Sequence, residues 1–235
     1  MQSVVILSKL IRLPHWGKNL LVFVPLITAH ELTNQTSLIA SALAFLSFSL
    51  AASSTYIIND ISDLESDRQH SQKRNRPLAS GVIQKSTSLI IALAMFVASI
   101  GISYRLPLEF LQILLFYVAT TLLYSLILKK LLVVDIVTLG VLFSVRIYAG
   151  GSATNIEISF WLLLFSFFIF FSLAIIKRYS DLSLEVANKQ GSLPGRAYLG
   201  SDMAPLLCIG IGSSVASILV LALYVIILVL ALYVI

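Results

Sequence analysis

Long apolar runs recur along the whole chain, and they constrain its fold more than any other feature. A helix needs about 20 apolar residues to cross the hydrocarbon core of a bilayer. Candidate spans occupy roughly 19–33, 37–58, 86–104, 107–128, 131–149, 159–176 and 203–235. The first is short and carries Pro25, which predicts an irregular helix or an earlier start. Hydrophobic residues make up 58% of the sequence and charged residues 11%, where a soluble domain averages about 25% charged. The sequence therefore predicts an all-α, polytopic membrane helix bundle with about seven spans.

Lysine and arginine residues collect in alternate loops, and this bias predicts the orientation of the chain. Cytoplasmic loops carry an excess of these residues. They precede the first candidate span and follow the second, fourth and sixth, whereas Arg105 is the only one in an opposite loop. The N-terminus and the long loops 59–85 and 177–202 are therefore expected in the cytoplasm. Arg12 and Trp16 are interpreted as interfacial anchors.

The net charge of +5 points to membrane lipids and phosphates. In a membrane protein, basic residues more often contact anionic lipid or phosphate than nucleic acid. We therefore expect membrane lipids as partners, and no nucleic acid.

The C-terminal end repeats the stretch ILVLALYVI, at 218–226 and again at 227–235. A repeat of this kind does not match a solenoid or propeller unit. We treat 1–235 as a single transmembrane domain and expect its C-terminus to be incomplete.

The loop behind the second candidate span begins with the acidic stretch NDISDLESD, residues 59–67. Asp60, Asp63 and Asp67 have the i, i+3, i+7 spacing of one helical stripe, and Asn59 lies at its edge. Carboxylates are costly beside hydrocarbon and usually serve a site there. Mg²⁺ usually binds through carboxylates together with substrate phosphates. The stripe predicts three Mg²⁺ ligands, of which Asp63 and Asp67 are also candidate catalytic residues.

Basic residues follow this acidic stretch at once. Lys73, Arg74 and Arg76 are candidate ligands for a diphosphate that Mg²⁺ bridges from the other side, and Asn59 joins them as a candidate substrate ligand. The alternative for the basic residues alone is a solvated loop that obeys the positive-inside rule.

A second charged segment follows the sixth candidate span. Lys177, Asp181 and Glu185 share a helix face at i, i+4, i+8 spacing, and Arg178 follows Lys177. Asp181 is a candidate metal ligand, Lys177 a candidate catalytic residue and Arg178 a candidate substrate ligand. The alternative is a stop-transfer flank with ion pairs on the helix surface.

Four further residues are candidates for substrate binding. Lys18 enters the bundle from the predicted active side, and Tyr124 and Lys129 lie near a cytoplasmic helix end. Arg146 lies within a span and needs a partner, for which Asp135 is a suggestion. Interfacial anchoring or snorkelling is the alternative for Tyr124, Lys129 and Arg146.

The segment NDISDLESDRQHSQKRNRPLASG resembles the NDxxDxxxD signature of the UbiA prenyltransferase superfamily, together with its downstream K-R-x-R-P-[LI]-A-x-G. Four more stretches look like their counterparts in the same order: LIRLPHWGKNLLVFVPL, YSLILKK, RIYAGG and KRYSDL. The W-x-K-N start and the D-R-x-H…K-R-x-R-P form look most like the decaprenyl-phosphate phosphoribosyltransferase branch.

This resemblance implies a bundle of about nine spans around a cavity that opens to the membrane. Two Asp-rich loops would bind a Mg²⁺–diphosphate at the cytoplasmic face, and the location would be a bacterial inner membrane. The resemblance matches Asn59 and the three aspartates to the first motif and segment 177–185 to the second. The second motif departs here from the strict D-x-x-x-D form and ends in Glu185.

The implied activity is transfer of phosphoribosyl from phosphoribosyl diphosphate to a polyprenyl phosphate. Mg²⁺ and basic side chains would stabilise the departing diphosphate. The acceptor is already anionic, so no general base is needed. The alternatives are an aromatic prenyltransferase that uses a prenyl diphosphate, a divalent-cation transporter, and a non-catalytic subunit of a membrane assembly.

Overall fold

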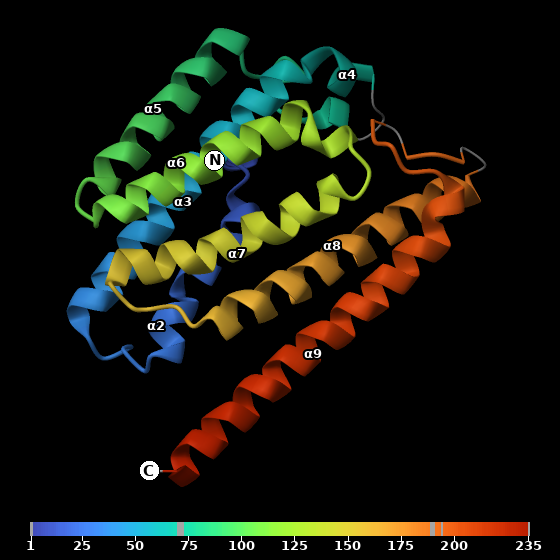
Figure 1. Ribbon diagram of the computed structural model, residues 1–235. Helices are drawn as coiled ribbons and strands as arrows, with labels where there is room; N and C mark the ends of the chain where they lie inside the picture. The colour runs from blue at the N-terminus through green and yellow to red at the C-terminus, as the bar shows by residue number, and fades with distance from the viewer. Residues whose placement is uncertain (1, 70–72, 189–190, 194, 235) are drawn as a thin grey trace. The chain divides into compact units, whose positions relative to one another are not determined.

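The computed structural model describes residues 2–69, 73–188, 191–193 and 195–234 (Figure 1). Within these ranges the regular structure is helical, apart from one isolated antiparallel bridge between Ser192 and Leu199. The described residues contain six helices long and apolar enough to cross a membrane. These are α3 (Gln35–Ser62), α5 (Lys85–Ser103), α6 (Leu108–Leu126), α7 (Val134–Thr154), α8 (Phe160–Ala187) and α9 (Met203–Val234). The all-α membrane fold is confirmed.

The remaining helices are short. The α-helices among them are α1 (Gln2–Leu10), α2 (Val24–Thr28) and α4 (Leu64–Gln69). The 3₁₀ helices are η1 (Leu13–Phe23), η2 (Lys73–Asn75), η3 (Leu128–Lys130) and η4 (Gly200–Asp202).

The first candidate span, 19–33, is irregular and does not form a single helix. The segment instead continues η1 to Phe23 and then forms the short helix α2, which ends at Thr28. Pro25 gives the physical reason, because it has no N–H to donate to the carbonyl of Leu21 in an α-helical bond. That carbonyl accepts a bond from the N–H of Val24 instead. The described spans are therefore six where the apolar runs predicted about seven.

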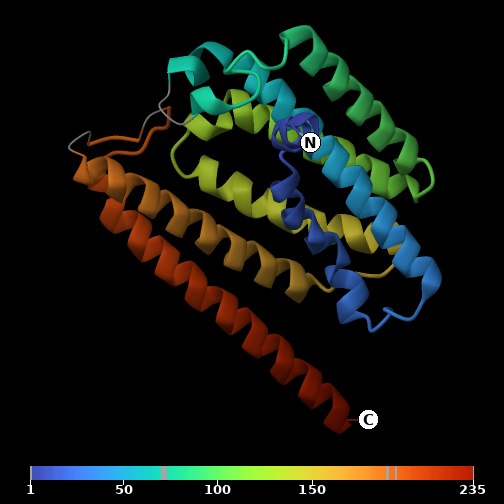
Figure 2. The ribbon, with the colours of Figure 1, turned by 180° about the vertical axis from the view of Figure 1, so that it is seen from behind.

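The chain divides into two compact units: residues 1–122 with 149–156, and residues 123–148 with 157–235. In the first unit, α3 packs along α5, and η1 lies against α3 (Figure 2). The α3–α5 contact contains a buried serine cluster, in which the Ser47 hydroxyl lies 3.1 Å from that of Ser99 and 2.9 Å from that of Ser103. Small residues with shared hydroxyl bonds let membrane helices approach closely.

Two further contacts fix η1 on α3 within the first unit. Trp16 donates its indole N–H to the hydroxyl of Ser53 at 3.0 Å. The Asn19 amide, which is buried, donates to the hydroxyl of Ser49 at 3.1 Å. Gly150 is packed against this same segment, since an added Cβ would lie 2.0 Å from the carbonyl oxygen of Val22.

In the second unit, α8 and α9 run side by side (Figure 1). Their contact again uses small and hydroxyl side chains. The Ser172 hydroxyl donates to the carbonyl of Gly210 at 3.2 Å and lies 2.6 Å from the Ser214 hydroxyl. A buried apolar cluster forms where the cytoplasmic end predicted for α8 meets the chain that follows it, and includes Ile136, Ile175, Leu182 and Tyr198.

Candidate functional site

The acidic stretch 59–67 lies where two helices meet. Helix α3 ends at Ser62, Asp63 forms its C-cap, and α4 begins at Leu64. The prediction of one continuous helical stripe is therefore wrong. Asp60 belongs to the last turn of α3 and Asp67 to α4, and the helix break sets their relative position.

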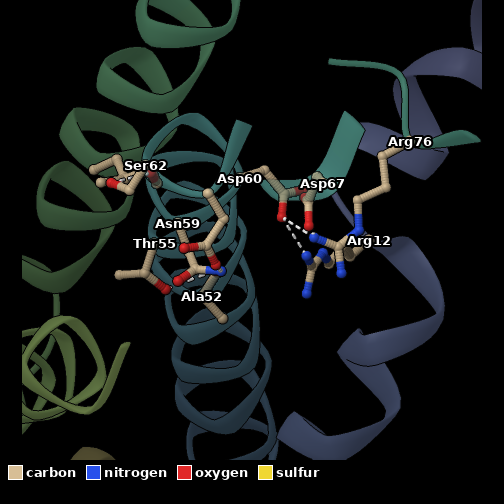
Figure 3. Close-up of polar contacts among 10 residues, drawn as sticks. Arg12, Ala52, Thr55, Asn59, Asp60, Ser62, Asp67 and Arg76 are labelled. Atoms are coloured by element: carbon tan, nitrogen blue, oxygen red, sulfur yellow. Dashed lines mark hydrogen bonds and ion pairs between the residues drawn. The ribbon is translucent and has the colours of Figure 1, made fainter. Parts of the chain in front are cut away.

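Asp60 and Asp67 are buried, with residue exposures of 5% and 1%, and two arginines neutralise them. One nitrogen of Arg76 lies 3.0 Å from an Asp60 oxygen and 2.5 Å from an Asp67 oxygen. A nitrogen of Arg12 lies 2.5 Å from the same Asp60 oxygen. Figure 3 shows both carboxylates turned toward these guanidinium groups. We name Arg12, Asp60, Asp67 and Arg76 the first cluster.

Arg12 is held in place by its backbone as well as its charge. It adopts φ 52° and ψ 47°, a left-handed conformation that costs a non-glycine residue roughly 1–2 kcal/mol. This bend joins α1 to η1 and lets the side chain reach Asp60. The Arg12 guanidinium carbon also lies 4.7 Å from the centre of the Tyr56 ring, close enough for a cation–π contact.

Asn59 and Asp63 form a separate contact beside the first cluster. The Asn59 amide donates to an Asp63 carboxylate oxygen at 3.2 Å. Both side chains are half-buried. The structure thus brings Asn59 to Asp63, and Asp60 to Asp67, in two pairs rather than one stripe.

The donor atoms of this stretch suit a hard cation. Among the described residues, no three His, Cys, Asp or Glu side chains lie close enough together to hold a metal ion. However, one oxygen of Asp67 is buried and makes no hydrogen bond in the described part of the chain. A buried carboxylate oxygen without a donor is costly unless something else binds it. The carboxylate set therefore fits Mg²⁺ chemically, with the arginines holding the charge in this structure.

The predicted basic run occupies η2 and the loop behind it. Arg76 contacts both buried carboxylates, and Lys73 and Arg74 lie on η2 with exposed side chains. Residues 70–72 lie outside the described residues.

A second cluster is built around Asp135, whose side chain is fully buried in the first turn of α7. A nitrogen of Arg196 lies 2.7 Å from one Asp135 oxygen, to which the Tyr124 hydroxyl donates at 2.7 Å. The Nε atom of Arg178 lies 2.8 Å from the other oxygen, as an ion pair without hydrogen-bond alignment. We name Tyr124, Asp135, Arg178 and Arg196 the second cluster.

Tyr198, in the loop between α8 and η4, packs against the second cluster. This side chain is 1% exposed, and the Arg178 guanidinium carbon lies 5.7 Å from its ring centre. Burial raises the pKa of the Tyr198 hydroxyl, and the Asp135 carboxylate raises it further. For Arg196, burial opposes the charge, but Tyr124 and Asp135 outweigh it and raise the pKa of the guanidinium. Both groups therefore keep their protons at neutral pH.

The predicted residues of segment 177–185 lie on the last turns of α8. Asp181 is 39% exposed at its side chain, and its oxygen lies 3.4 Å from Arg178. Lys177 is exposed. Arg178, by contrast, is buried against Asp135. The segment therefore combines one buried cation with an exposed lysine and a partly exposed carboxylate.

The three remaining candidates are Lys18, Lys129 and Arg146. Lys18 is exposed on η1, and Lys129 is half-buried on η3. Arg146 is buried in α7 and donates to the Leu142 carbonyl at 2.5 Å. The suggested pairing of Arg146 with Asp135 is wrong, because eleven residues of one helix span about 16 Å. Asp135 pairs with Arg178 and Arg196 instead.

Sequence reasoning missed two cations of these clusters. The sequence pattern indicates interfacial anchoring for Arg12 and no site role for Arg196. Each lies far along the chain from its carboxylate, 48 residues for Arg12 and 61 for Arg196. Helical periodicity carries no signal at that separation. The one available hint was that buried Asp60 and Asp135 each needed a cation.

Known proteins share both the sequence and the fold of this chain. A model of the UbiA prenyltransferase family matches residues 20–235. The decaprenyl-phosphate phosphoribosyltransferase of Mycobacterium tuberculosis H37Rv is 35% identical over 182 residues, which cover 75% of this chain and 60% of that protein. An uncharacterized protein, y4nM of Sinorhizobium fredii, is 36% identical over 214 residues, which cover 91% of this chain and 42% of that protein. The chain thus spans about half the length of these relatives.

A solved UbiA homolog from Archaeoglobus fulgidus, bound to DMAPP and Mg²⁺, has the same fold. Its TM-score is 0.70 at 21% identity, over 93% of this chain and 84% of that one. The six apolar helices and these likenesses together describe an integral membrane protein. From the family match over residues 20–235, we conclude that the chain belongs to the UbiA prenyltransferase family.

Proposed function

We propose that this chain is an intramembrane, Mg²⁺-dependent transferase that moves phosphoribosyl from phosphoribosyl diphosphate to a polyprenyl phosphate. The first cluster carries the proposal, because it holds two buried carboxylates and two arginines within ion-pair distance. A metal diphosphate needs both kinds of group, carboxylates for the cation and guanidinium groups for the anion. Relatives named decaprenyl-phosphate phosphoribosyltransferase support the choice of donor and acceptor.

The residues keep the roles predicted from the sequence. Proposed metal ligands are Asp60, Asp63, Asp67 and Asp181, and proposed catalytic residues are Asp63, Asp67 and Lys177. Proposed substrate ligands are Lys18, Asn59, Lys73, Arg74, Arg76, Tyr124, Lys129, Arg146 and Arg178. We further propose that the chain lies in a bacterial inner membrane with its N-terminus and both charged segments in the cytoplasm.

The chain's own side chains would act mainly by charge. Bound Mg²⁺ would supply stabilisation for negative charge that develops on the leaving diphosphate. Arg76, Arg74 and Lys73 would hold the diphosphate oxygens as the bond between the anomeric carbon and oxygen breaks, with the electron pair leaving on diphosphate. A phosphate oxygen of the acceptor then forms the new bond to that carbon. Because this oxygen is already anionic, the site needs no base.

The proposal is tested with the purified chain, labelled phosphoribosyl diphosphate, a polyprenyl phosphate and Mg²⁺. We expect a labelled lipid product, and we expect Asp63→Asn to abolish it. Glu65→Gln is the matched control, because Glu65 lies on the neighbouring helix α4 with an exposed side chain. Full turnover by Asp63→Asn would refute the assignment of the metal site.

A second candidate is transfer of a prenyl group to an aromatic or other acceptor. Two observations favour it: the similar fold of the archaeal UbiA homolog bound to GPP and Mg²⁺, and a digeranylgeranylglyceryl phosphate synthase 29% identical over 137 residues. The same assay decides between the two, with labelled prenyl diphosphate and an aromatic acid as the second pair of substrates. Product from that pair alone would replace phosphoribosyl by prenyl as the transferred group.

A further inference from the structure

A cavity of about 620 Å³ lies in the first unit, next to the arginines of the first cluster. It is bounded by helix α1, the start of η1 and the loop around Arg76. Its lining residues are Val5, Ser8, Lys9, Arg12, Pro14, His15, Asn75, Arg76 and Pro77. We name it the α1 pocket. Arg12 and Arg76 belong both to this pocket and to the first cluster.

The α1 pocket is electropositive. Lys9, Arg12 and Arg76 line it, and none of its lining residues in the described part of the chain is acidic. Asp60 and Asp67 lie behind the arginines and balance two of these three charges. The charge of Lys9 therefore adds to a site whose other cations are already offset, and an anion is the ligand that this arrangement favours.

Arg12 and Arg76 can bind the carboxylates of the first cluster and an anion in the α1 pocket at the same time. A guanidinium group carries five N–H donors in a planar fork. The ion pairs to the carboxylates use one terminal nitrogen of Arg12 and one of Arg76. Each side chain thus has further donors with which to bind an anion in the pocket while the carboxylate fixes its orientation. An arginine held in this way binds phosphate oxygens with little loss of side-chain freedom.

The size and walls of the pocket indicate an organic phosphate rather than a bare ion. Ligand pockets commonly measure about 300–1,000 Å³ and have mostly apolar walls with a few placed polar groups. Val5, Pro14 and Pro77 supply apolar surface next to the cations here. A phosphate ester would place its charged group on the basic residues and its substituent against this surface.

We propose that the α1 pocket is a binding site for a phosphate monoester. This inference rests on the proposed function, which supplies two such groups: the head group of a polyprenyl phosphate and the 5-phosphate of the phosphoribosyl donor. Both present a phosphate dianion on a carbon chain or ring. The chemistry of recognition is shared, and the choice between the two is made by experiment.

The test measures binding without turnover. The full chain is placed in nanodiscs of zwitterionic lipid with EDTA, and titrated with geranyl monophosphate, ribose 5-phosphate or the neutral alcohol geraniol. We expect at least one phosphate ester to bind and geraniol to bind far more weakly. Lys9→Ala should raise the dissociation constant about two- to fivefold, the effect of one exposed ion pair. Lys9→Arg should restore it.

Lys85→Ala is the matched control, because Lys85 is an exposed lysine of the same unit that does not line the pocket. Binding of geranyl monophosphate alone would identify the lipid head group as the ligand, and binding of ribose 5-phosphate alone would identify the donor. The inference is overturned if neither ester binds, or if Lys9→Ala and Lys85→Ala have equal effects. If an ester binds but the chain has no transferase activity, the proposed function is refuted and the α1 pocket remains a phosphate-ester site.

Discussion

The second cluster makes a strong prediction about stability, because Asp135 is the counter-ion of a buried arginine. We consider the replacement Asp135→Asn, which changes the shape of the side chain little. It removes the negative charge from a fully buried position and leaves Arg178, 3% exposed at its side chain, without its carboxylate at 2.8 Å. Removing one partner of a buried pair costs about 3–5 kcal/mol, since the remaining charge stays desolvated. Arg196 is 23% exposed and suffers less.

For a chain of this length, 1 kcal/mol corresponds to about 2–4 °C in melting temperature. We therefore expect Asp135→Asn to melt about 6–20 °C below the unmodified protein. The measurement is thermal unfolding of the detergent-purified chain in EDTA, followed by differential scanning fluorimetry.

The chain offers a matched control for this experiment. Asp181→Asn removes the same charge from another partner of Arg178, but Asp181 is 39% exposed and 3.4 Å away. An exposed pair contributes about 0–1 kcal/mol, so the melting temperature should fall by less than about 4 °C. The reasoning is refuted if both variants fall equally, or if Asp135→Asn stays within 2 °C of the unmodified protein, a shift of about 1 kcal/mol or less.

Three further predictions use the same unfolding assay. Gly150→Ala should destabilise the protein by about 1–3 kcal/mol, because the added Cβ would lie 2.0 Å from the Val22 carbonyl oxygen. Its control is Gly101→Ala, whose Cβ would have nothing within 4 Å. That variant should be neutral or stabilise the protein by up to about 1 kcal/mol. Equal shifts would contradict the close packing. Ser47→Ala should cost about 0.6–2 kcal/mol by breaking the buried hydroxyl cluster, and no change would dismiss that contact. With Mg²⁺ in place of EDTA, Asp67→Asn should lose the rise in melting temperature that Mg²⁺ gives the unmodified protein, and a retained rise would exclude Asp67 as a ligand.

The sequence predicted the long helices well, because hydropathy over about 20 residues is a local signal. At 19–33 the missing N–H of Pro25 favours 3₁₀ geometry over a spanning helix, and Pro25 is the residue that indicates this irregularity in the sequence. The sequence pattern also placed Asp60 and Asp67 on one helix, although α3 ends before Asp63 and α4 begins after it. The spacing alone could not show the break, since both arrangements keep the carboxylates near each other.

The ion-pair partners were the least predictable part of the candidate site. Arg76 follows Asp67 by nine residues, and the basic run made it visible. Arg178 and Arg196 are joined to Asp135 only by the way the chain folds back, over 43 and 61 residues. The cost of burying a charge implies that a buried carboxylate needs a cation nearby. It does not indicate which arginine or lysine the fold brings to that carboxylate.

These separations also determine when each carboxylate meets its cation as the chain is made. Arg12 leaves the ribosome 48 residues before Asp60, so the first cluster has one of its cations from the start. Asp135 emerges before both of its arginines. At about 5–20 residues per second, the 43- and 61-residue delays amount to roughly 2–12 s. During synthesis, Asp135 at the start of α7 therefore waits for both of its arginines until α8 and the loop behind it have been made.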